Sequence, residues 1–157
     1  MKYIQCPDVF SPKSMTDYSN TVFLAGGISN CPDWQKDFVD YLTFLDKDIN
    51  LTIINPRRNI FDISNNKLTK EQIAWEYKHL QFCDIKVFWF PKETLCPITL
   101  FELGRHCNTK HLYVGCDGSY ARRLDIFYQM GHIRRDFVLY YDLHSLIYCL
   151  YRDFTHA

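Results

Sequence analysis

The sequence lacks any apolar run approaching the roughly 18 residues that a membrane-spanning helix needs. Its first ten residues also lack the apolar core of a secretory signal peptide. No repeat or low-complexity segment is visible in the 157 residues, a length typical of one ordinary domain. We therefore expect a cytoplasmic protein with no membrane partner, in which a strap or tail over residues 1–20 precedes a single domain over residues 21–157.

Net charge is absent as well, because 18 lysines and arginines balance 18 aspartates and glutamates. Binding to long nucleic acid depends on the release of counterions from many phosphates, which favours a basic protein. The balance therefore argues against a long nucleic acid as partner, but not against a small nucleotide held by a few local groups. Aromatic residues make up 17%, which suits either a packed interface or a site that stacks flat rings.

The seven cysteines include no C-x-x-C pair, and no cysteine or histidine cluster has the spacing of a metal site. An odd and scattered set of cysteines is typical of reduced thiols in the cytosol. The glycine-rich dinucleotide fingerprint and the Walker A lysine are also missing. We therefore expect no metal site.

Short apolar runs alternate with amphipathic stretches from Thr21 onward. Five runs predict buried strands, at residues 21–25, 51–54, 85–90, 111–115 and 137–140. Helical spacing of apolar residues predicts helices over 32–45, 69–82, 97–107 and, after a cap at Asp142, 143–150. Because strands alternate with helices, we expect an α/β fold with a mostly parallel sheet of about five strands and helices on both faces.

The helical spacing also predicts which side of each helix packs on the sheet. The predicted core residues are Ile73, Ala74, Tyr77 and Leu80 in the second helix, and Leu100, Leu103, Gly104 and Cys107 in the third. Glu102 lies roughly opposite the stripe of the third helix, so solvent exposure is the default expectation for its carboxylate. The spacing also permits a carboxylate that faces a cleft.

Ligands of parallel sheets bind beyond the carboxyl ends of the strands, where two turns carry suggestive residues. Gly26 and Gly27 let a ligand approach the backbone before a helix begins, although a simple strand-to-helix turn has the same pattern. Asn55 is followed by Arg57 and Arg58, whose guanidinium groups suit phosphate or carboxylate. The simpler alternative for this second turn is a solvated loop with one surface ion pair.

Several motifs resemble, in their order and spacing, the nucleoside 2-deoxyribosyltransferase-like family. They are Phe23-Leu-Ala-Gly-Gly27 with Trp34, Asn55-Pro-Arg-Arg58, Trp75-Glu76, Cys83-Asp84, Phe88-Trp-Phe-Pro-Lys-Glu-Thr94 and Pro97-Ile-Thr-Leu-Phe-Glu-Leu-Gly104. The resemblance covers about residues 21–131 and points to a branch with the signature F-W-F-P … P-I … E-L-G. It implies a flavodoxin-like (Rossmann-like) sheet and chemistry at the anomeric carbon of a sugar.

The glutamate of the E-L-G motif corresponds to Glu102. The resemblance implies that this carboxylate attacks the anomeric carbon and forms a covalent glycosyl-enzyme while the base departs. A second base or water then completes the reaction. Asp84 corresponds to an aspartate near the leaving base, where a carboxyl group can protonate or hold a ring nitrogen. An aspartate just before a strand also often caps the preceding helix.

The resemblance implies further binding residues. Gly26 and Gly27 allow the sugar to approach the backbone, and Glu93 contacts base or sugar. Trp34 and Trp89 shape the pocket, although a buried tryptophan is usually core. A Tyr-x-Arg-Arg-x-Asp pattern recurs in this branch and either binds substrate or braces the site. Its residues here are Tyr120, Arg122, Arg123 and Asp125.

The first hypothesis is therefore an enzyme that cleaves the N-glycosidic bond of a small nucleoside or nucleotide, without metal or cofactor. It would act as a transferase or as an N-glycosidase. The arginine pairs make a phosphorylated substrate plausible, which favours hydrolysis. Enzymes of the family are oligomers whose neighbours often complete the pocket, so the resemblance also implies a homo-oligomer.

Two positions depart from the better-known deoxyribosyltransferases. Phe23 stands where they place a tyrosine that holds the nucleophile, and Cys96 stands where they carry an acidic residue six positions before it. Both departures favour an alternative, a nucleotide-binding or sensor domain that keeps the fold without turnover. A further alternative is a glycohydrolase for NAD or a related dinucleotide, which uses similar glutamate chemistry.

Overall fold

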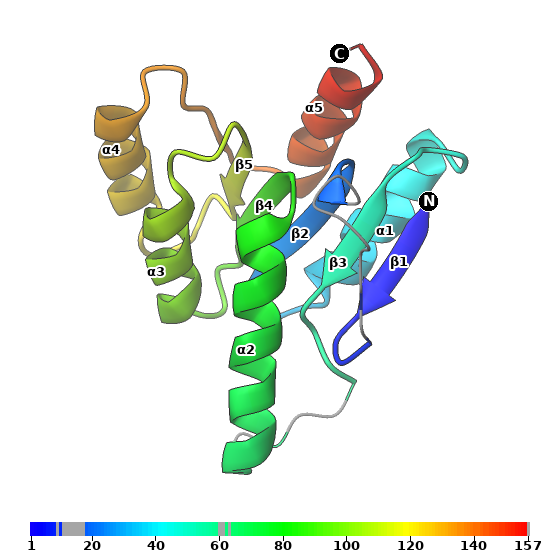
Figure 1. The fold of residues 1–157 in the computed structure, drawn as a ribbon. Helices are drawn as coiled ribbons and strands as arrows, with labels where there is room; N and C mark the ends of the chain where they lie inside the picture. Colours follow the sequence, from blue (N-terminus) through cyan, green and yellow to red (C-terminus); the bar gives the residue numbers. More distant parts are fainter. Residues whose placement is uncertain (9, 11–17, 60–61, 63, 157) are drawn as a thin grey trace.

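The structure is a computed structural model that describes residues 1–8, 10, 18–59, 62 and 64–156. Within these residues, six parallel strands form one sheet in the order β1-β3-β2-β4-β5-β6 (Figure 1). The strands are β1 (Lys2–Gln5), β2 (Thr21–Gly26), β3 (Thr52–Asn55), β4 (Ile85–Phe90), β5 (His111–Cys116) and β6 (Leu139–Tyr140). The helices are α1 (Trp34–Leu45), α2 (Asn66–Phe82), α3 (Pro97–His106), α4 (Arg123–Ile133) and α5 (Leu143–Thr155). Within the described ranges, no helix is both long and apolar enough to cross a membrane.

The strand order reverses at β2, which pairs with β3 on one side and with β4 on the other. Without β1, this is the order of the flavodoxin-like doubly wound fold, so the predicted fold class is confirmed. Ligands of such sheets bind beyond the carboxyl ends of the strands at the point of reversal. In this chain that point lies at the turns that follow Gly26 and Phe90.

The predicted number of about five strands is wrong, because Lys2–Gln5 forms a sixth strand at the edge of the sheet. β1 pairs in parallel with β3, from Lys2 opposite Thr52 to Gln5 opposite Asn55. The predicted strap or tail over residues 1–20 therefore contains an edge strand near its beginning. Its four residues are exposed or half-buried, so the sequence shows no buried apolar run there. Residues 9 and 11–17 of the predicted strap lie outside the described residues.

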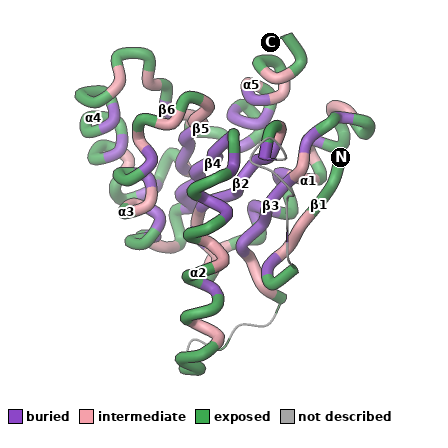
Figure 2. Tube along the Cα trace, viewed as in Figure 1, coloured by how far each residue is buried: buried purple, intermediate pink, exposed green. Residues whose placement is uncertain are grey.

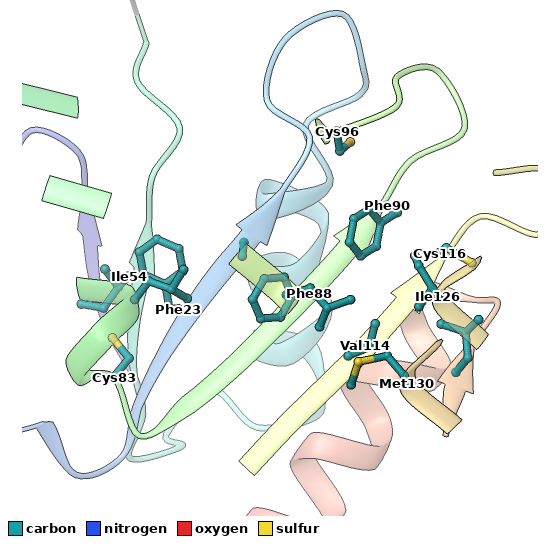
Figure 3. Packing of buried hydrophobic residues seen from close by; sticks show 14 of the residues in the cluster. Phe23, Ile54, Cys83, Phe88, Phe90, Cys96, Val114, Cys116, Ile126 and Met130 are labelled. Carbon is teal, nitrogen blue, oxygen red and sulfur yellow. The ribbon is translucent and has the colours of Figure 1, made fainter. Parts of the chain in front are cut away.

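Two hydrophobic clusters fill the two faces of the sheet, and Figure 2 shows the buried positions gathered on the strands between the helices. α1 and α5 pack beside each other over one face. α2, α3 and α4 contribute Leu80, Leu103 and Met130 to the other. Figure 3 shows part of this second cluster, in which Val114 of β5 lies beside Ile126 and Met130 of α4.

The first and last helices follow the sequence pattern closely. The Asp33 side chain caps α1 by accepting a hydrogen bond from the Lys36 backbone, so Pro32 precedes the helix rather than standing in its first turn. The predicted cap at Asp142 is confirmed, because its carboxylate accepts from the Ser145 backbone at 2.7 Å. The predicted apolar face of α5 is buried throughout.

The predicted core face of α2 is largely wrong. Ile73 and Tyr77 are 59% and 55% exposed, and Ala74 is exposed as well. The inward positions are Gln72, His79 and Leu80, with Glu76 half-buried between them. In α3 the buried residues are Thr99, Leu103 and His106, while Gly104 of the predicted stripe is exposed. Hydrophobic periodicity fails here because the inward faces of both helices carry polar side chains.

Candidate active site

Glu102 lies in the middle of α3 and is half-buried rather than exposed. Burial raises the pKa of its carboxyl group to about 7, the negative charge of Glu76 raises it further, and Arg105 opposes the shift. The default expectation of a solvated carboxylate is therefore wrong. The site holds a glutamate that changes its charge close to neutral pH.

Glu76 on α2 is the second carboxyl group of the site. It is half-buried, and burial raises its pKa, while a hydrogen bond from Gln72 and the charge of Arg58 act in the opposite direction. The sequence motif Trp75-Glu76 marked this position without giving it a role. Gln72 and Glu76 are polar residues one helical turn apart, in a helix that packs on the sheet. This spacing is the sequence pattern that could have indicated a role for Glu76.

Gln72 joins the site to the carboxyl ends of two strands. Its Nε2 donates to Glu76 Oε1 at 2.6 Å and to the Pro56 carbonyl at 2.8 Å. Its Oε1 accepts from Arg58 Nε and from the Cys6 thiol. The second arginine of the Asn55–Arg58 turn therefore acts on the glutamate pair from the end of β3.

Asn55 and Arg57, both predicted to bind substrate, make hydrogen bonds inside the protein. Arg57 Nε donates to Gln35 Oε1 at 3.0 Å, its Nη2 donates to the Pro32 carbonyl, and it forms an ion pair with Asp33. Asn55 is 2% exposed and donates to the Tyr3 hydroxyl. These bonds fix the turn after β3 against the β2–α1 loop. A direct contact of either residue with substrate stays a prediction.

The two glycines after β2 are surrounded by the protein's own side chains. A Cβ at Gly26 would lie 2.4 Å from the Trp89 carbonyl oxygen and 2.5 Å from the Trp34 ring. A Cβ at Gly27 would lie 2.8 to 3.1 Å from Pro91, Cys96 and Cys31. Trp34 Nε1 also donates to the Gly27 carbonyl at 2.9 Å. The packing requires glycine at this tight strand-to-helix turn, whether or not a sugar approaches it.

Three of the predicted pocket residues do come together. Trp34, Trp89 and Glu93 line a cavity of about 280 Å³ at the carboxyl edge of the sheet, on the side covered by α1 and α5. The cavity is smaller than most small-molecule sites. Its other charged lining residues are Asp33, Asp37, Asp117 and Asp142. Glu102 is not part of this lining.

Asp84 lies away from the other predicted site residues. It immediately precedes β4, and its backbone N–H donates to Thr21 Oγ1 at the start of β2, so it sits at the amino edge of the sheet. It lines a cavity of about 680 Å³ there, with residues of β5, β6 and α5. A six-residue strand is about 20 Å long, which separates Asp84 from the carboxyl edge. The structure therefore does not bring Asp84 together with the predicted pocket.

The residues from Tyr120 to Asp125 have different environments, because one supports a neighbouring loop and others lie on the surface. Tyr120 is 0% exposed, and its hydroxyl donates to the Leu95 carbonyl at 2.7 Å. It therefore braces the loop that leads into α3. Arg122 and Asp125 form an exposed ion pair at 3.4 Å. Arg123 is the half-buried first residue of α4.

Phe23 and Cys96 are the two positions that depart from the better-known transferases. Neither supplies the tyrosine hydroxyl or the carboxyl group that those enzymes have there. Phe23 is buried in β2 with its ring 6.3 Å from that of Trp75. Cys96 precedes α3 in a left-handed backbone conformation, and burial raises the pKa of its thiol to about 11. Cys96 is therefore a neutral thiol near pH 7. In the part of the chain that the structure describes, no group of three or more acidic, histidine or cysteine residues could hold a metal ion.

The structure is an α/β protein in which Glu76 and Glu102 lie on consecutive helices that cover one face of a parallel sheet. The model of a family described as nucleoside 2-deoxyribosyltransferase like matches residues 19–120, which is most of the chain and includes Glu76 and Glu102. The chain belongs to this family. None of the curated proteins matches it significantly.

Proposed function

We propose that this protein cleaves the N-glycosidic bond of a small nucleoside or nucleotide, with Glu102 as the nucleophile. Membership of the family suggests a function like that of a nucleoside deoxyribosyltransferase. The observation that most supports the chemistry is the pair of half-buried carboxyl groups, Glu76 and Glu102, on two helices of the matched region. Pairs of carboxyl groups in different environments are typical of enzymes that break glycosidic bonds.

In the first step, an ionised Glu102 oxygen attacks the anomeric carbon. The bond from that carbon to the base nitrogen breaks, and its electron pair leaves with the base. In the second step, water or the nitrogen of another base attacks the same carbon, and the ester bond to Glu102 breaks. The first outcome is hydrolysis and releases free sugar, whereas the second is transfer and yields a new nucleoside.

The charges of the pair favour this displacement. Two nearby carboxylates repel each other, and burial strengthens the repulsion because less water screens it. The transition state places positive charge on the sugar ring, which a neighbouring pair of carboxylates stabilises. Glu102 must be ionised to attack, so base release should increase as the pH rises through about 7. Asp84 takes no part in this mechanism, since it lies at the opposite edge of the sheet.

Exposed apolar side chains near Glu102 support the expected homo-oligomer. Leu95, just before α3, and Ile98, in its first turn, are exposed, and Phe101, next to Glu102, is 69% exposed. Exposed apolar side chains that gather in this way commonly mark a protein interface. We propose that a second copy of the chain covers this side of α3.

The second candidate is a nucleotide-binding or sensor domain without turnover. Phe23 cannot donate a hydrogen bond to the nucleophile, and the Cys96 thiol is neutral near pH 7. Asn55 and Tyr120 use their polar groups inside the protein. This candidate predicts binding of nucleotide with no release of base.

The test is a chromatographic assay for free base, with the protein incubated with pooled nucleosides, nucleotides and NAD. The account predicts a new base peak that disappears in Glu102→Gln and persists in the control Glu71→Gln, because Glu71 is exposed on α2. An added isotope-labelled base distinguishes transfer from hydrolysis. Tight nucleotide binding by calorimetry, with no base peak over hours, would instead establish the binding domain.

A further inference from the structure

The side-chain amide of Gln72 is buried, and all of its hydrogen-bonding positions have partners. Both Nε2 hydrogens are donated, one to the Pro56 carbonyl and one to Glu76 Oε1. Oε1 accepts from Arg58 Nε and, at 3.1 Å, from the thiol of Cys6. Burial raises the pKa of Cys6, so that this sulfur carries its hydrogen at neutral pH. The network ties the ends of β1 and β3 to α2.

These partners allow only one orientation of the amide. Pro56 offers a carbonyl oxygen, and Arg58 offers an N–H group, which can only donate. A flipped amide would place oxygen against the Pro56 oxygen and NH₂ against the Arg58 guanidinium. Gln72 must therefore direct an N–H group toward Glu76. A neutral amide donor at 2.6 Å favours the ionised form of the carboxyl group that accepts it.

We propose that Gln72 is a positioning residue, which fixes the Glu76 carboxyl group beside the candidate nucleophile Glu102 and favours its ionised form. This inference rests on the proposed function, because that function gives Glu102 its role as nucleophile. The titration that tests the inference does not require the protein to be active. Gln72 acts through Glu76, and Glu76 acts on Glu102 by its charge. The other groups that act on the two carboxyl groups are Arg58, from the end of β3, and Arg105, on α3 itself.

A matched control exists on the opposite face of the sheet. Gln35 on α1 is also buried, and it accepts from Arg57 Nε as Gln72 accepts from Arg58 Nε. The amide of Gln35 donates to the Gly27 carbonyl, with no carboxylate as acceptor among the described residues. Gln35→Met therefore removes a buried amide and the partner of an arginine, but it leaves the glutamate pair untouched.

The experiment is a carboxyl titration by NMR. The sequence contains four glutamates, Glu71, Glu76, Glu93 and Glu102, so selective ¹³C labelling gives four carboxyl signals. Single glutamate-to-glutamine substitutions assign them. In Gln72→Met, loss of the donor raises the pKa of Glu76. Because Glu76 then carries less negative charge where Glu102 titrates, the pKa of Glu102 falls toward its value in Glu76→Gln. Gln35→Met leaves both titrations as in the unmodified protein.

A double-variant cycle separates positioning from a general structural effect. Glu76→Gln alone should lower the pKa of Glu102, because it removes the neighbouring charge. Adding Gln72→Met to Glu76→Gln should then produce no further change, because Gln72 acts through Glu76. If Gln72→Met fails to fold, Arg58→Met disturbs the same network and should also raise the pKa of Glu76. It removes the N–H group that orients Gln72, and a positive charge that favours ionised Glu76.

The positioning role would be overturned if both glutamates titrate unchanged in Gln72→Met and Arg58→Met. It would also be overturned if Gln35→Met shifts the titrations as much as Gln72→Met does. The proposed function fails separately, if the unmodified protein releases no base while the titrations shift as expected. If both hold, the acid limb of kcat/KM moves to lower pH in Gln72→Met by the same amount as the Glu102 titration. An activity loss without any movement of that limb would also contradict the inference.

Discussion

Glu76 and Glu102 lie on consecutive helices of the chain, and the charge of Glu76 raises the pKa of Glu102. Such a pair costs free energy when both groups are ionised, because two like charges are held close together and partly away from water.

The rate of base release should follow the ionisation of Glu102. We expect kcat/KM to rise with pH and to level off above about 7. In Glu76→Gln the neighbouring charge is absent, so the acid limb should move to lower pH by about one unit. A pH profile from 5 to 9 measures both. An acid limb that stays in place, or moves to higher pH, would show that the pair is not coupled.

Glu102→Gln should stabilise the protein in mildly alkaline solution. The pKa of Glu102 is about 7 in the folded state and near 4.5 when the group is solvated, so the folded state holds this proton more tightly. The contribution of Glu102 to stability is therefore fully present below pH 4.5, and it is lost as the pH rises through 7. Because the group is half-exposed, we expect a gain of only about 1 kcal/mol in the free energy of unfolding at pH 8.

Urea unfolding at pH 4.5 and at pH 8 measures this gain, with Glu71→Gln as the exposed control. The stabilisation by Glu102→Gln should appear at pH 8 and shrink at pH 4.5. Destabilisation at both values would mean that the carboxyl group supports the fold, and would count against its role in chemistry.

Gly26→Ala should destabilise the fold strongly. The added methyl group would lie 2.4 Å from the Trp89 carbonyl oxygen, which belongs to the adjacent strand and cannot move without breaking the sheet. Overpacking of this kind costs about 1 to 3 kcal/mol or more. The control is Gly131→Ala in α4, where the methyl group meets nothing within 4 Å. That change should stabilise the helix by up to about 1 kcal/mol, and thermal melting compares the two. Equal melting temperatures would contradict the packing described for Gly26.

A second copy of the chain should cover the exposed side of α3. Phe101→Asp places a charge at a position that is 69% exposed, so it should shift an oligomer toward monomer without unfolding it. Tyr148→Asp, at a position 52% exposed on α5, is the matched control. Light scattering after size-exclusion chromatography gives the masses. A monomeric unmodified protein, or dissociation by the α5 variant alone, would refute this interface.

Much of the fold follows from the sequence because local patterns and packing agree. β4 matches its predicted bounds, Ile85–Phe90, since it is apolar throughout and bounded by turn residues. α5 matches its predicted face for the same reason. β1 could not be predicted, because a four-residue edge strand buries too little to show an apolar pattern.

The site was harder to predict than the fold. Glu102 came from the resemblance, while its burial came only from the structure, because the spacing of α3 permits either orientation. Gln72 and Glu76 were missed because the prediction placed apolar residues on the inward face of α2. Their partners lie at the ends of β1 and β3 and on α3, and only the assembled fold brings these together. Asp84 is the opposite case. Its motif stands in the expected order in the sequence, but the fold places it at the amino edge of the sheet, away from the predicted pocket.

The most direct test of the central claim is whether a sugar becomes bonded to Glu102. Mass spectrometry of protein quenched during turnover should find the added mass of one glycosyl group on the peptide that contains Glu102. Glu102→Gln should lose that adduct together with base release, by at least about 10³-fold, while remaining folded. Undiminished base release by Glu102→Gln, or an adduct on another residue, would contradict the account.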